Sequence, residues 1–361
     1  MGLVKLFELM ISRGASDMHL RAGLPAVIRV NKRLEKVEME PLTAETISNF
    51  ISGILDEKRK NELERNLQCD FSHFIQGVGR FRCAAFYQKG SLGVVFRAIP
   101  DAPSDFRALN LPEVLEKICR YSNGLVLVTG PAGSGKSTTL AAMINHINES
   151  RRSHIVTLED PIEYFFKDKK SVITQRELGI DMISYTAALK NIVREDPDVI
   201  LIGEMRDIDT ISAGISVAEV GNLVLSSVHT INTFQTVSRI IDFYPVAHQN
   251  QVRGQLSEIL RAVISMRLMP SKDKNSLVPV CEILINTEIV KKHIAENNLS
   301  EIYDVMVKGS YYGMQTFNQA LVGLCQDGVI TEEDALKVST NPEEFRLYIR
   351  GIDTTTAATG K

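Results

Sequence analysis

The chain has 361 residues, enough for two domains of ordinary size or one large one. Its 44% hydrophobic and 24% charged residues are typical of a globular protein, and its net charge of −3 lacks the basic excess expected of a nucleic-acid-binding protein. No apolar run approaches the ~20 residues that cross a bilayer, no signal-peptide pattern opens the chain, and the five cysteines are too widely spaced for a zinc site. We therefore expect a cytoplasmic protein with reduced thiols, no integral membrane segment and no nucleic-acid partner.

The first hundred residues predict a small α+β domain. An amphipathic helix opens it, with one apolar face made of Leu3, Leu6, Phe7, Met10 and Ile11. A second apolar stripe at helical spacing predicts a helix over Thr43–Asn66, with Thr43 as its cap. Short strands are predicted over residues 26–30, 34–37, 69–75, 80–88 and 92–99.

Two prolines, Pro100 and Pro103, indicate a linker, which we place at residues 101–111 between domains at 1–100 and 112–352. Beyond it, strands are expected at 125–129, 155–158, 171–175, 198–203 and 223–229, with helices at 136–149, 184–195 and 207–220. This alternation predicts an α/β fold with a parallel sheet wrapped by helices. From about residue 246 we expect mostly helix, and a disordered tail at 353–361.

A glycine-rich turn follows the first of these strands. Residues Gly130–Thr138 read Gly-Pro-Ala-Gly-Ser-Gly-Lys-Ser-Thr and run into a good helix former. Backbone N–H groups of such a turn close around phosphate oxygens, while Lys136 reaches the terminal phosphates and Ser137 holds a magnesium ion. The strand before and the helix after this turn argue against a chance match, and we predict an ATP or GTP site. Its predicted binding residues are Gly130, Gly133, Ser134, Gly135, Lys136, Ser137 and Thr138, together with Glu159 at the end of the next strand.

Carboxylates follow two further predicted strands, where ligands of open parallel sheets bind. Glu159 and Glu163 follow one strand and are candidates to position the attacking water, although solvated loop carboxylates are the alternative. Glu204 follows another strand and is the candidate magnesium ligand. Asp198 is less suitable, since six strand residues at ~3.3 Å each place it about 20 Å from the phosphate end.

One histidine and several arginines complete the set. His229, at the end of the strand over 223–229, is placed to sense the terminal phosphate, but a lone histidine is often structural. Arg80, Arg82 and Arg97 alternate with apolar residues on adjacent predicted strands and so share a polar face. That face is either solvated or aimed at a phosphate supplied by a neighbouring domain or subunit.

Together these segments resemble the secretion ATPases, hexameric motors of type II secretion and type IV pili, and within them the pilus-retraction branch. The matching segments are Gly130–Thr138, Thr157–Glu163, Gln175–Glu177, Arg194–Asp198, Gly203–Asp207 and Val228–Thr230, with Gly14–Leu20 and Gly313–Phe317. Assembly-type relatives usually carry a longer N-terminal region and a tetracysteine zinc element, and the lack of both favours retraction.

The resemblance implies a PAS-like first domain and a RecA-like second one. It makes Glu163 the residue that activates water, Glu204 the Walker B glutamate near magnesium and His229 a member of the family's His box. Arg82 and Arg97 match arginines that contact nucleotide phosphates, whereas the roles of Arg194, Arg206 and Arg239 are less defined. It also implies a homohexamer at the base of the pilus, peripheral to the inner membrane, with a platform protein as partner and a paralogous retraction ATPase as a further candidate partner.

Two departures from the family pattern stand out. Asn222 occupies a position where retraction enzymes usually have a second histidine, and Thr287–Glu296 replaces the retraction signature Ala-Ile-Arg-Asn-Leu-Ile-Arg-Glu. Our hypothesis is an ATP- and Mg²⁺-dependent retraction motor. Its alternatives are an accessory paralogue with reduced turnover and a RecA-like nucleic-acid translocase, which would need a basic channel and stacking aromatics.

Overall fold

A computed structural model describes residues 2–103 and 105–352. Contacts divide them into two compact units. The first extends to Asp101 and includes Glu163–Phe165, and the second contains the remaining described residues. The predicted tail at 353–361 lies outside the described residues. Within those residues, no helix is both long and apolar enough to span a membrane.

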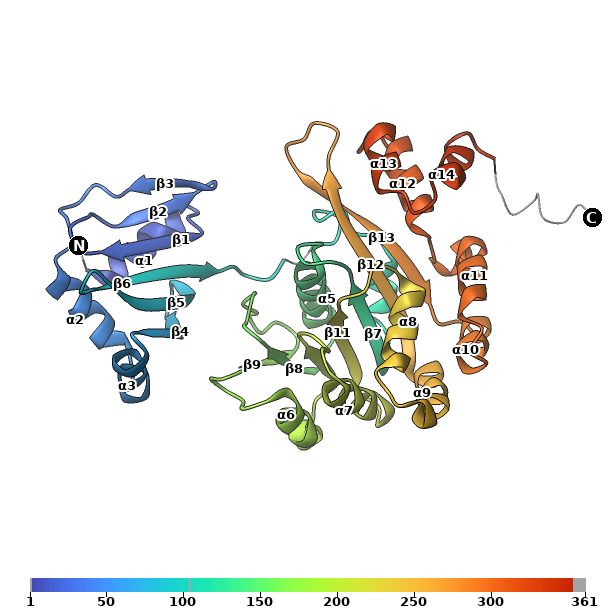
Figure 1. Cartoon of the computed structure of the whole chain (residues 1–361), viewed down its shortest axis with the longest axis horizontal. Helices are drawn as coiled ribbons and strands as arrows, with labels where there is room; N and C mark the ends of the chain where they lie inside the picture. Colours follow the sequence, from blue (N-terminus) through green and yellow to red (C-terminus); the bar gives the residue numbers. More distant parts are fainter. Residues whose placement is uncertain (1, 104, 353–361) are drawn as a thin grey trace, which may run out of the picture. The chain divides into compact units, whose positions relative to one another are not determined.

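The first unit is built on a six-stranded antiparallel sheet with the order β3-β2-β1-β6-β5-β4 (Figure 1). Its strands are β1 (Asp17–Arg21), β2 (Val27–Val30), β3 (Arg33–Lys36), β4 (Gln68–Ile75), β5 (Gly79–Gln88) and β6 (Ser91–Ile99). Its helices are α1 (Leu3–Ser12), α2 (Ala44–Ile54) and α3 (Glu57–Asn66). Of these strands, β1 was not predicted from the sequence.

The helix predicted over Thr43–Asn66 is wrong in its length. Thr43 does cap α2, accepting a hydrogen bond from Thr46 N at 3.1 Å, as predicted. The helix then ends because Leu55 is extended, and Asp56 begins α3 by accepting from Arg59 N at 2.8 Å. The predicted single helix is therefore two helices, separated where the side chain of Asp56 caps α3.

The core of the first unit forms where α1 meets the sheet. The Phe7 ring lies 4.3 Å from the Phe81 ring and 4.8 Å from the Phe96 ring, the second pair edge to face, as aromatic rings prefer. Leu6, Phe7 and Met10 are fully buried, but Ile11 is 43% exposed, so its predicted place on the apolar face of α1 is wrong.

The second unit contains a seven-stranded sheet with the order β13-β12-β7-β11-β10-β8-β9 (Figure 1). All neighbouring strands are parallel except β12 and β13, which confirms the predicted α/β class with a parallel-rich sheet. The strands are β7 (Gly124–Thr129), β8 (His154–Glu159), β9 (Val172–Glu177), β10 (Val199–Ile202), β11 (Leu223–Val228), β12 (Leu260–Pro270) and β13 (Leu277–Ile285). The helices up to β12 are α4 (Val114–Ile118), α5 (Lys136–Ser150), α6 (Tyr185–Ile192), α7 (Ile208–Glu219), α8 (Thr233–Asp242) and α9 (Val246–Ile259).

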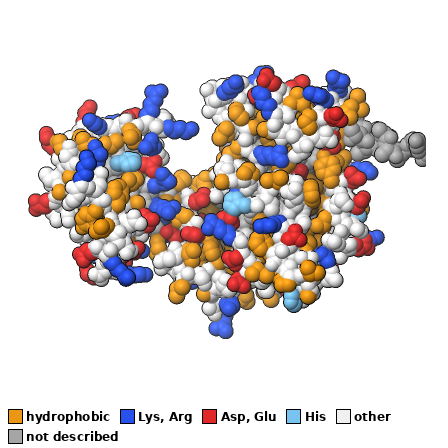
Figure 2. Space-filling view, in the orientation of Figure 1, with side chains coloured by type: hydrophobic (Ala, Val, Ile, Leu, Met, Phe, Trp, Pro, Cys, Tyr) orange, Lys and Arg blue, Asp and Glu red, His pale blue; other side chains and the backbone are white. Residues whose placement is uncertain are grey.

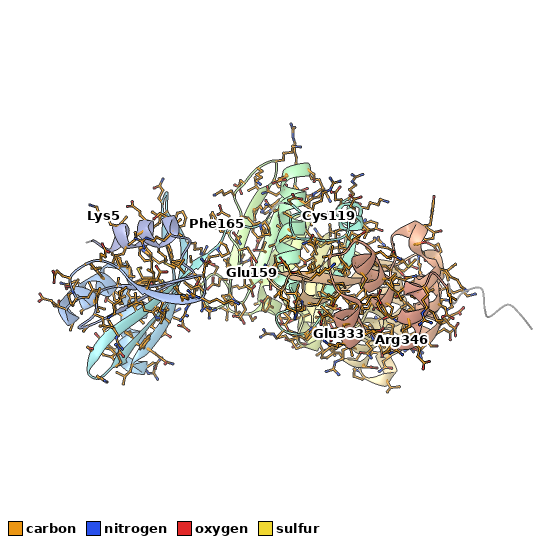
Figure 3. The ribbon with its side chains drawn as sticks, turned by 90° about the horizontal axis from the view of Figure 1, so that it is seen from above. Lys5, Cys119, Glu159, Phe165, Glu333 and Arg346 are labelled. Atoms are coloured by element: carbon orange, nitrogen blue, oxygen red, sulfur yellow. The ribbon has the colours of Figure 1, made fainter. Side chains whose placement is uncertain are left out.

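The expectation of mostly helix after residue 246 is wrong for the β12–β13 hairpin. Both strands are buried on both faces, so they lack the alternation that identifies a half-exposed strand. The helices that follow the hairpin are α10 (Glu288–Ala295), α11 (Ile302–Lys308), α12 (Phe317–Gln326), α13 (Glu332–Val338) and α14 (Pro342–Ile349). In Figure 3, Glu333 and Arg346 mark α13 and α14, and Lys5 marks α1.

Candidate functional site

The glycine-rich turn joins β7 to α5 in a conformation that needs its glycines. Gly130, Gly133 and Gly135 have φ values of +146°, +75° and +94°. A Cβ atom on Gly130 would lie 2.5 Å from both Met266 O and Ser134 Oγ. The strand before the turn is braced by β12, because Thr129 Oγ1 lies 2.6 Å from Ser265 Oγ. The turn therefore has a fixed, tight backbone.

Lys136 begins α5 and folds back over the turn. Its Nζ atom donates to Gly130 O at 2.8 Å and to Pro131 O at 3.0 Å, and it lies 3.4 Å from His229 Nδ1. Ser137 and Thr138 follow in the first turn of the helix, where backbone N–H groups favour anions. The lysine amine is therefore held at the phosphate loop.

The loop fits the triphosphate that its sequence implies. Ser134 Oγ is buried and has no hydrogen-bond partner in the described part of the chain. No atom lies within 4 Å of a Cβ placed on Gly133, so that side of the loop is open. An orphaned hydroxyl beside an open glycine turn is suited to a phosphate oxygen.

The strand register brings three further predicted residues, His229, Glu204 and Glu159, to the same edge of the sheet. Thr129 of β7 pairs with Val228 of β11, and Ile202 of β10 pairs with Ser226. Gly130, His229 and Glu204 therefore follow neighbouring parallel strands. Glu159, the last residue of β8, is buried and accepts from Thr157 Oγ1 at 2.6 Å and from Gln175 Nε2 at 3.2 Å.

Glu204 is held on both carboxylate oxygens. Oε1 lies 2.9 Å from His229 Nε2, and Oε2 lies 2.9 Å from Arg206 Nε. The hydrogen bond and the charge of Glu204 together raise the pKa of Arg206. Glu204 and Ser137 carry oxygen atoms of the kind that Mg²⁺ prefers, so their chemistry fits the magnesium site predicted from the sequence. Within residues 2–103 and 105–352, no group of three or more His, Cys, Asp or Glu side chains forms a separate metal site.

Tyr185 of α6 lies near the acidic residues that follow β8, and it was not singled out from the sequence. Burial, followed by the carboxylates of Asp160 and Glu159, raises the pKa of its phenol. The hydroxyl therefore stays protonated near these acids and is available as a donor. Its place on α6 carries no motif, so the sequence offered no signal for it.

The remaining predicted residues lie in the first unit. Glu163 groups with that unit, where Phe165 N donates to Pro100 O at 2.9 Å. Figure 3 labels Phe165 there and Glu159 in the second unit. Arg82 and Arg97 are direct register partners on β5 and β6, which confirms that they share one face of the sheet.

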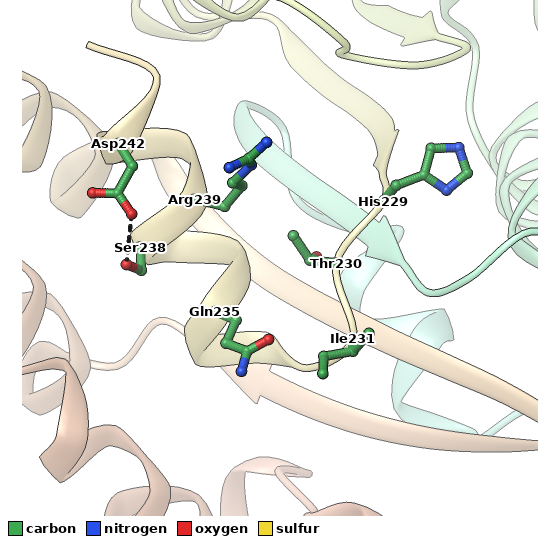
Figure 4. A pocket seen from close by; sticks show the side chains of 7 residues that line it. All are labelled: His229, Thr230, Ile231, Gln235, Ser238, Arg239 and Asp242. Carbon is green, nitrogen blue, oxygen red and sulfur yellow. Dashed lines mark hydrogen bonds between the residues drawn. The ribbon is translucent and has the colours of Figure 1, made fainter. Parts of the chain in front are cut away.

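A pocket of about 380 Å³ lies along α8 and the segment that leads into it (Figure 4). Ser238 donates to Asp242 across one wall at 3.2 Å, and the Arg239 guanidinium lies 5.0 Å from the centre of the Phe243 ring. The pocket is lined by His229, Thr230, Ile231, Gln235, Ser238, Arg239 and Asp242. His229 therefore contacts the phosphate loop and also lines this pocket.

The two departures from the family pattern lie away from the phosphate loop. Asn222 precedes β11 at its opposite end, about 20 Å from His229 for six strand residues. Its side chain donates to Pro197 O and its carbonyl accepts from Gly124 N at 3.0 Å. The 287–296 segment forms α10 with its cap, and Lys291 Nζ lies 2.6 Å from Glu258 Oε2 of α9.

Comparison with known proteins places these features in one family. Residues 5–341 match the family described as "Type II/IV secretion system protein". The chain is 40% identical to the "Type IV pilus retractation ATPase PilT" of Pseudomonas aeruginosa, over 96% of this chain and 100% of that protein. It is 39% identical to the "Type IV pilus ATPase PilU" of the same organism, over 96% and 91%. A crystal structure of "the Pilus Retraction Motor PilT and Bound ADP" superposes with a TM-score of 0.85 at 42% identity, covering 95% of this chain and 98% of that one.

Proposed function

The chain belongs to the type II/IV secretion system protein family and is an ATPase of the pilus-retraction type, and we propose that it works as a Mg²⁺-dependent homohexamer. The observation that carries the proposal is the meeting of Lys136, His229 and Glu204 at the mouth of the parallel sheet. These residues come from three separate segments, and their meeting at a phosphate loop supports nucleotide turnover.

Each residue has a role in this proposal. Lys136 and the backbone of Gly133–Ser137 bind the phosphates, and Ser137 and Glu204 hold Mg²⁺. When bound, Mg²⁺ neutralises the charge that develops on the transferring phosphoryl group. Glu163 accepts a proton from the attacking water, and His229 registers the terminal phosphate through its contact with Lys136.

Arg82 and Arg97 supply positive charge from the first unit. A guanidinium group can donate two parallel hydrogen bonds to the oxygens of one phosphate. The side chains of Arg82 and Arg97 are both exposed. We propose that these arginines engage the phosphates of bound ATP and release them after hydrolysis. The resulting movement of the first unit would act on a platform protein in the inner membrane and draw pilin subunits back. The motor would then be cytoplasmic and peripheral to that membrane.

The test of the enzyme uses two variants and one control. Glu163→Gln should bind ATP as the wild type does but lose turnover, whereas Lys136→Ala should lose binding. Glu333→Gln, an exposed carboxylate on α13, is the control and should leave both unchanged. Undiminished hydrolysis by Glu163→Gln would refute its role. Specific activity that does not rise with protein concentration would count against the oligomer.

An accessory role is the second candidate, because the chain is nearly as similar to the relative named PilU as to the one named PilT. Asn222 gives this candidate no support, since it lies at the far end of β11. A deletion strain separates the two roles. Excess pili with no surface motility would indicate the main retraction motor, and normal retraction force would indicate an accessory subunit. Loss of pili would contradict both.

A further inference from the structure

We propose that Asp17 is a positioning residue that fixes the guanidinium of Arg97 in the orientation needed to bind a phosphate. The inference rests on the proposed function, in which Arg97 engages bound ATP. It concerns a contact between β1 and β6 that joins residues 80 positions apart in the sequence.

One row of register partners crosses the sheet of the first unit. Arg29 of β2 pairs with Asp17 of β1, Asp17 pairs with Arg97 of β6, and Arg97 pairs with Arg82 of β5. Residues paired directly across neighbouring strands point to the same face of a sheet. Three arginines and one carboxylate therefore share this row, which leaves it with an excess of positive charge.

Asp17 is the buried member of the row. Its side chain is 8% exposed, whereas that of Arg97 is 68% exposed. One oxygen, Oδ1, accepts from Arg97 Nε at 2.8 Å. The other, Oδ2, accepts from Ser16 Oγ at 2.8 Å and lies 3.7 Å from Arg29 Nε. Burial alone would raise the pKa of Asp17, but the hydrogen bonds from Ser16 and Arg97 outweigh it and lower that pKa. The carboxylate is therefore ionised and fixed.

Arg97 is anchored at one position only. Asp17 holds its Nε atom, while its terminal nitrogens form no hydrogen bond with any residue that the structure describes. A guanidinium held at Nε keeps its terminal fork free for an anion, and a fixed side chain loses less conformational freedom when it binds. Asp17 thus orients Arg97 without taking the nitrogens that a phosphate would use.

The order of the charges along this row differs from that of a cross-strand ion pair that only stabilises the sheet. Arg97 and Arg82 lie directly opposite each other, and like charges in that arrangement destabilise a sheet. Asp17 offsets the repulsion on one side only, since no ion pair joins Arg82 to any described carboxylate. A row built only for stability would have placed a carboxylate opposite Arg82.

The test is a double-mutant cycle on the full-length protein, using Asp17→Asn, Arg97→Ala and the combination. Glu35→Gln removes another carboxylate of the same sheet that pairs with Arg13, and it serves as the matched control. We expect Asp17→Asn to lower kcat for ATP at least about tenfold, because a displaced group loses its alignment with the reacting phosphate. Nucleotide affinity should change less than kcat. In the Arg97→Ala background, the same change should have no further effect.

Three results would overturn the inference. The first is a kcat for Asp17→Asn within twofold of wild type, even with a lower melting temperature. The second is an equal loss of kcat with and without Arg97. The third is an unchanged kcat for Asp17→Glu, the variant to use if Asp17→Asn does not fold. Asp17→Glu keeps the charge but shifts the oxygens, and it should melt like the wild type with reduced kcat.

The outcome is separable from that of the proposed function. If Lys136→Ala and Glu163→Gln behave as expected and Arg97→Ala lowers kcat, an Asp17→Asn variant with wild-type kcat rejects only the role of Asp17. If Glu163→Gln hydrolyses ATP normally, the proposed turnover mechanism fails whatever Asp17 does.

Discussion

The Nε2 atom of His229 lies 2.9 Å from Oε1 of Glu204. An ionised carboxylate only accepts hydrogen bonds, so Nε2 donates, and Nδ1 is left facing the Lys136 ammonium at 3.4 Å as an acceptor. One neutral tautomer of the imidazole satisfies both neighbours. A phosphate that draws Lys136 away, or a cation that takes Glu204, therefore changes the partners of His229.

Replacing His229 should separate turnover from binding. We expect His229→Ala to reduce ATP turnover by about 10- to 100-fold, because the link between Lys136 and Glu204 is broken. Affinity for ATP should fall much less, since the loop backbone and Lys136 remain. Steady-state kinetics with a fluorescent-nucleotide titration would measure both. His248→Ala, an exposed histidine on α9, is the control, and equal losses in both variants would contradict this role.

Arg206 should compete with Mg²⁺ for Glu204. Its guanidinium holds Oε2 at 2.9 Å, where a bound cation would need a free oxygen. We expect Arg206→Gln to lower the Mg²⁺ concentration for half-maximal nucleotide binding by at least about twofold, because a competing positive charge is removed. Nucleotide titrations at several Mg²⁺ concentrations would show this. Arg346→Gln on α14 is the control, and a raised Mg²⁺ requirement for Arg206→Gln would mean that Arg206 assists the cation.

Glu282 of β13 should make stability depend on pH. It is buried and accepts from Thr233 N and Oγ1 at 2.8 and 2.9 Å, at the start of α8. Burial raises its pKa above 4.5, although hydrogen bonds from Thr233 and Phe317 oppose the shift. The folded protein therefore binds this proton more tightly than the unfolded chain. The stability that this provides is complete below about pH 4.5 and is lost as the pH rises through the raised pKa.

Two variants test this sign. The unfolding free energy of Glu282→Gln, relative to wild type, should increase between pH 4.5 and 7, because the amide does not ionise. Glu282→Ala should be less stable by about 2–4 kcal/mol at pH 7, since it leaves the Thr233 donors unpaired. Denaturant unfolding at the two pH values gives both quantities. The exposed Glu288→Gln is the control, and a Glu282→Gln difference that stays constant with pH would contradict the assignment.

The cysteines should resist alkylation in the folded protein. Cys325 is the only partly exposed thiol of the five, and burial followed by Glu332 raises its pKa to about 11. The thiolate is the reactive form, so labelling of Cys325 by iodoacetamide at pH 8 should be roughly 100-fold slower than for a free thiol. The other four should label only after unfolding. Mass spectrometry with and without guanidinium would show this, and rapid labelling of native protein would contradict it.

The central sheet could be predicted because its strands have a clear signal in the sequence. Continuous apolar runs such as Val199–Ile202 are buried on both faces, and short helices separate them. Since parallel strands share one carboxyl edge, the sequence already implied that Glu204 and His229 meet near Gly130. Alternation likewise predicted that Arg82 and Arg97 share a face.

The errors arose where contacts join distant parts of the chain. β12 pairs with β13 on one side and with β7 on the other, and the two-sided burial of β12 and β13 resembles that of a core helix. The contact between Asp17 and Arg97 spans 80 positions and leaves no local pattern. Asn222 lies at the end of β11 opposite to the phosphate loop, where its carbonyl accepts a hydrogen bond from Gly124 N. Its role depends on which end of the strand it occupies, and its neighbours in the sequence do not show this.

The β12–β13 hairpin sets a limit on how far this protein can be shortened. A fragment ending at Ile259 would retain all the nucleotide motifs up to Thr230, and nothing in its sequence would warn of damage. It would nonetheless lose Ser265 and Met266, against which Thr129 and Gly130 are fitted. The shape of the phosphate loop therefore depends on a segment that carries no recognisable motif.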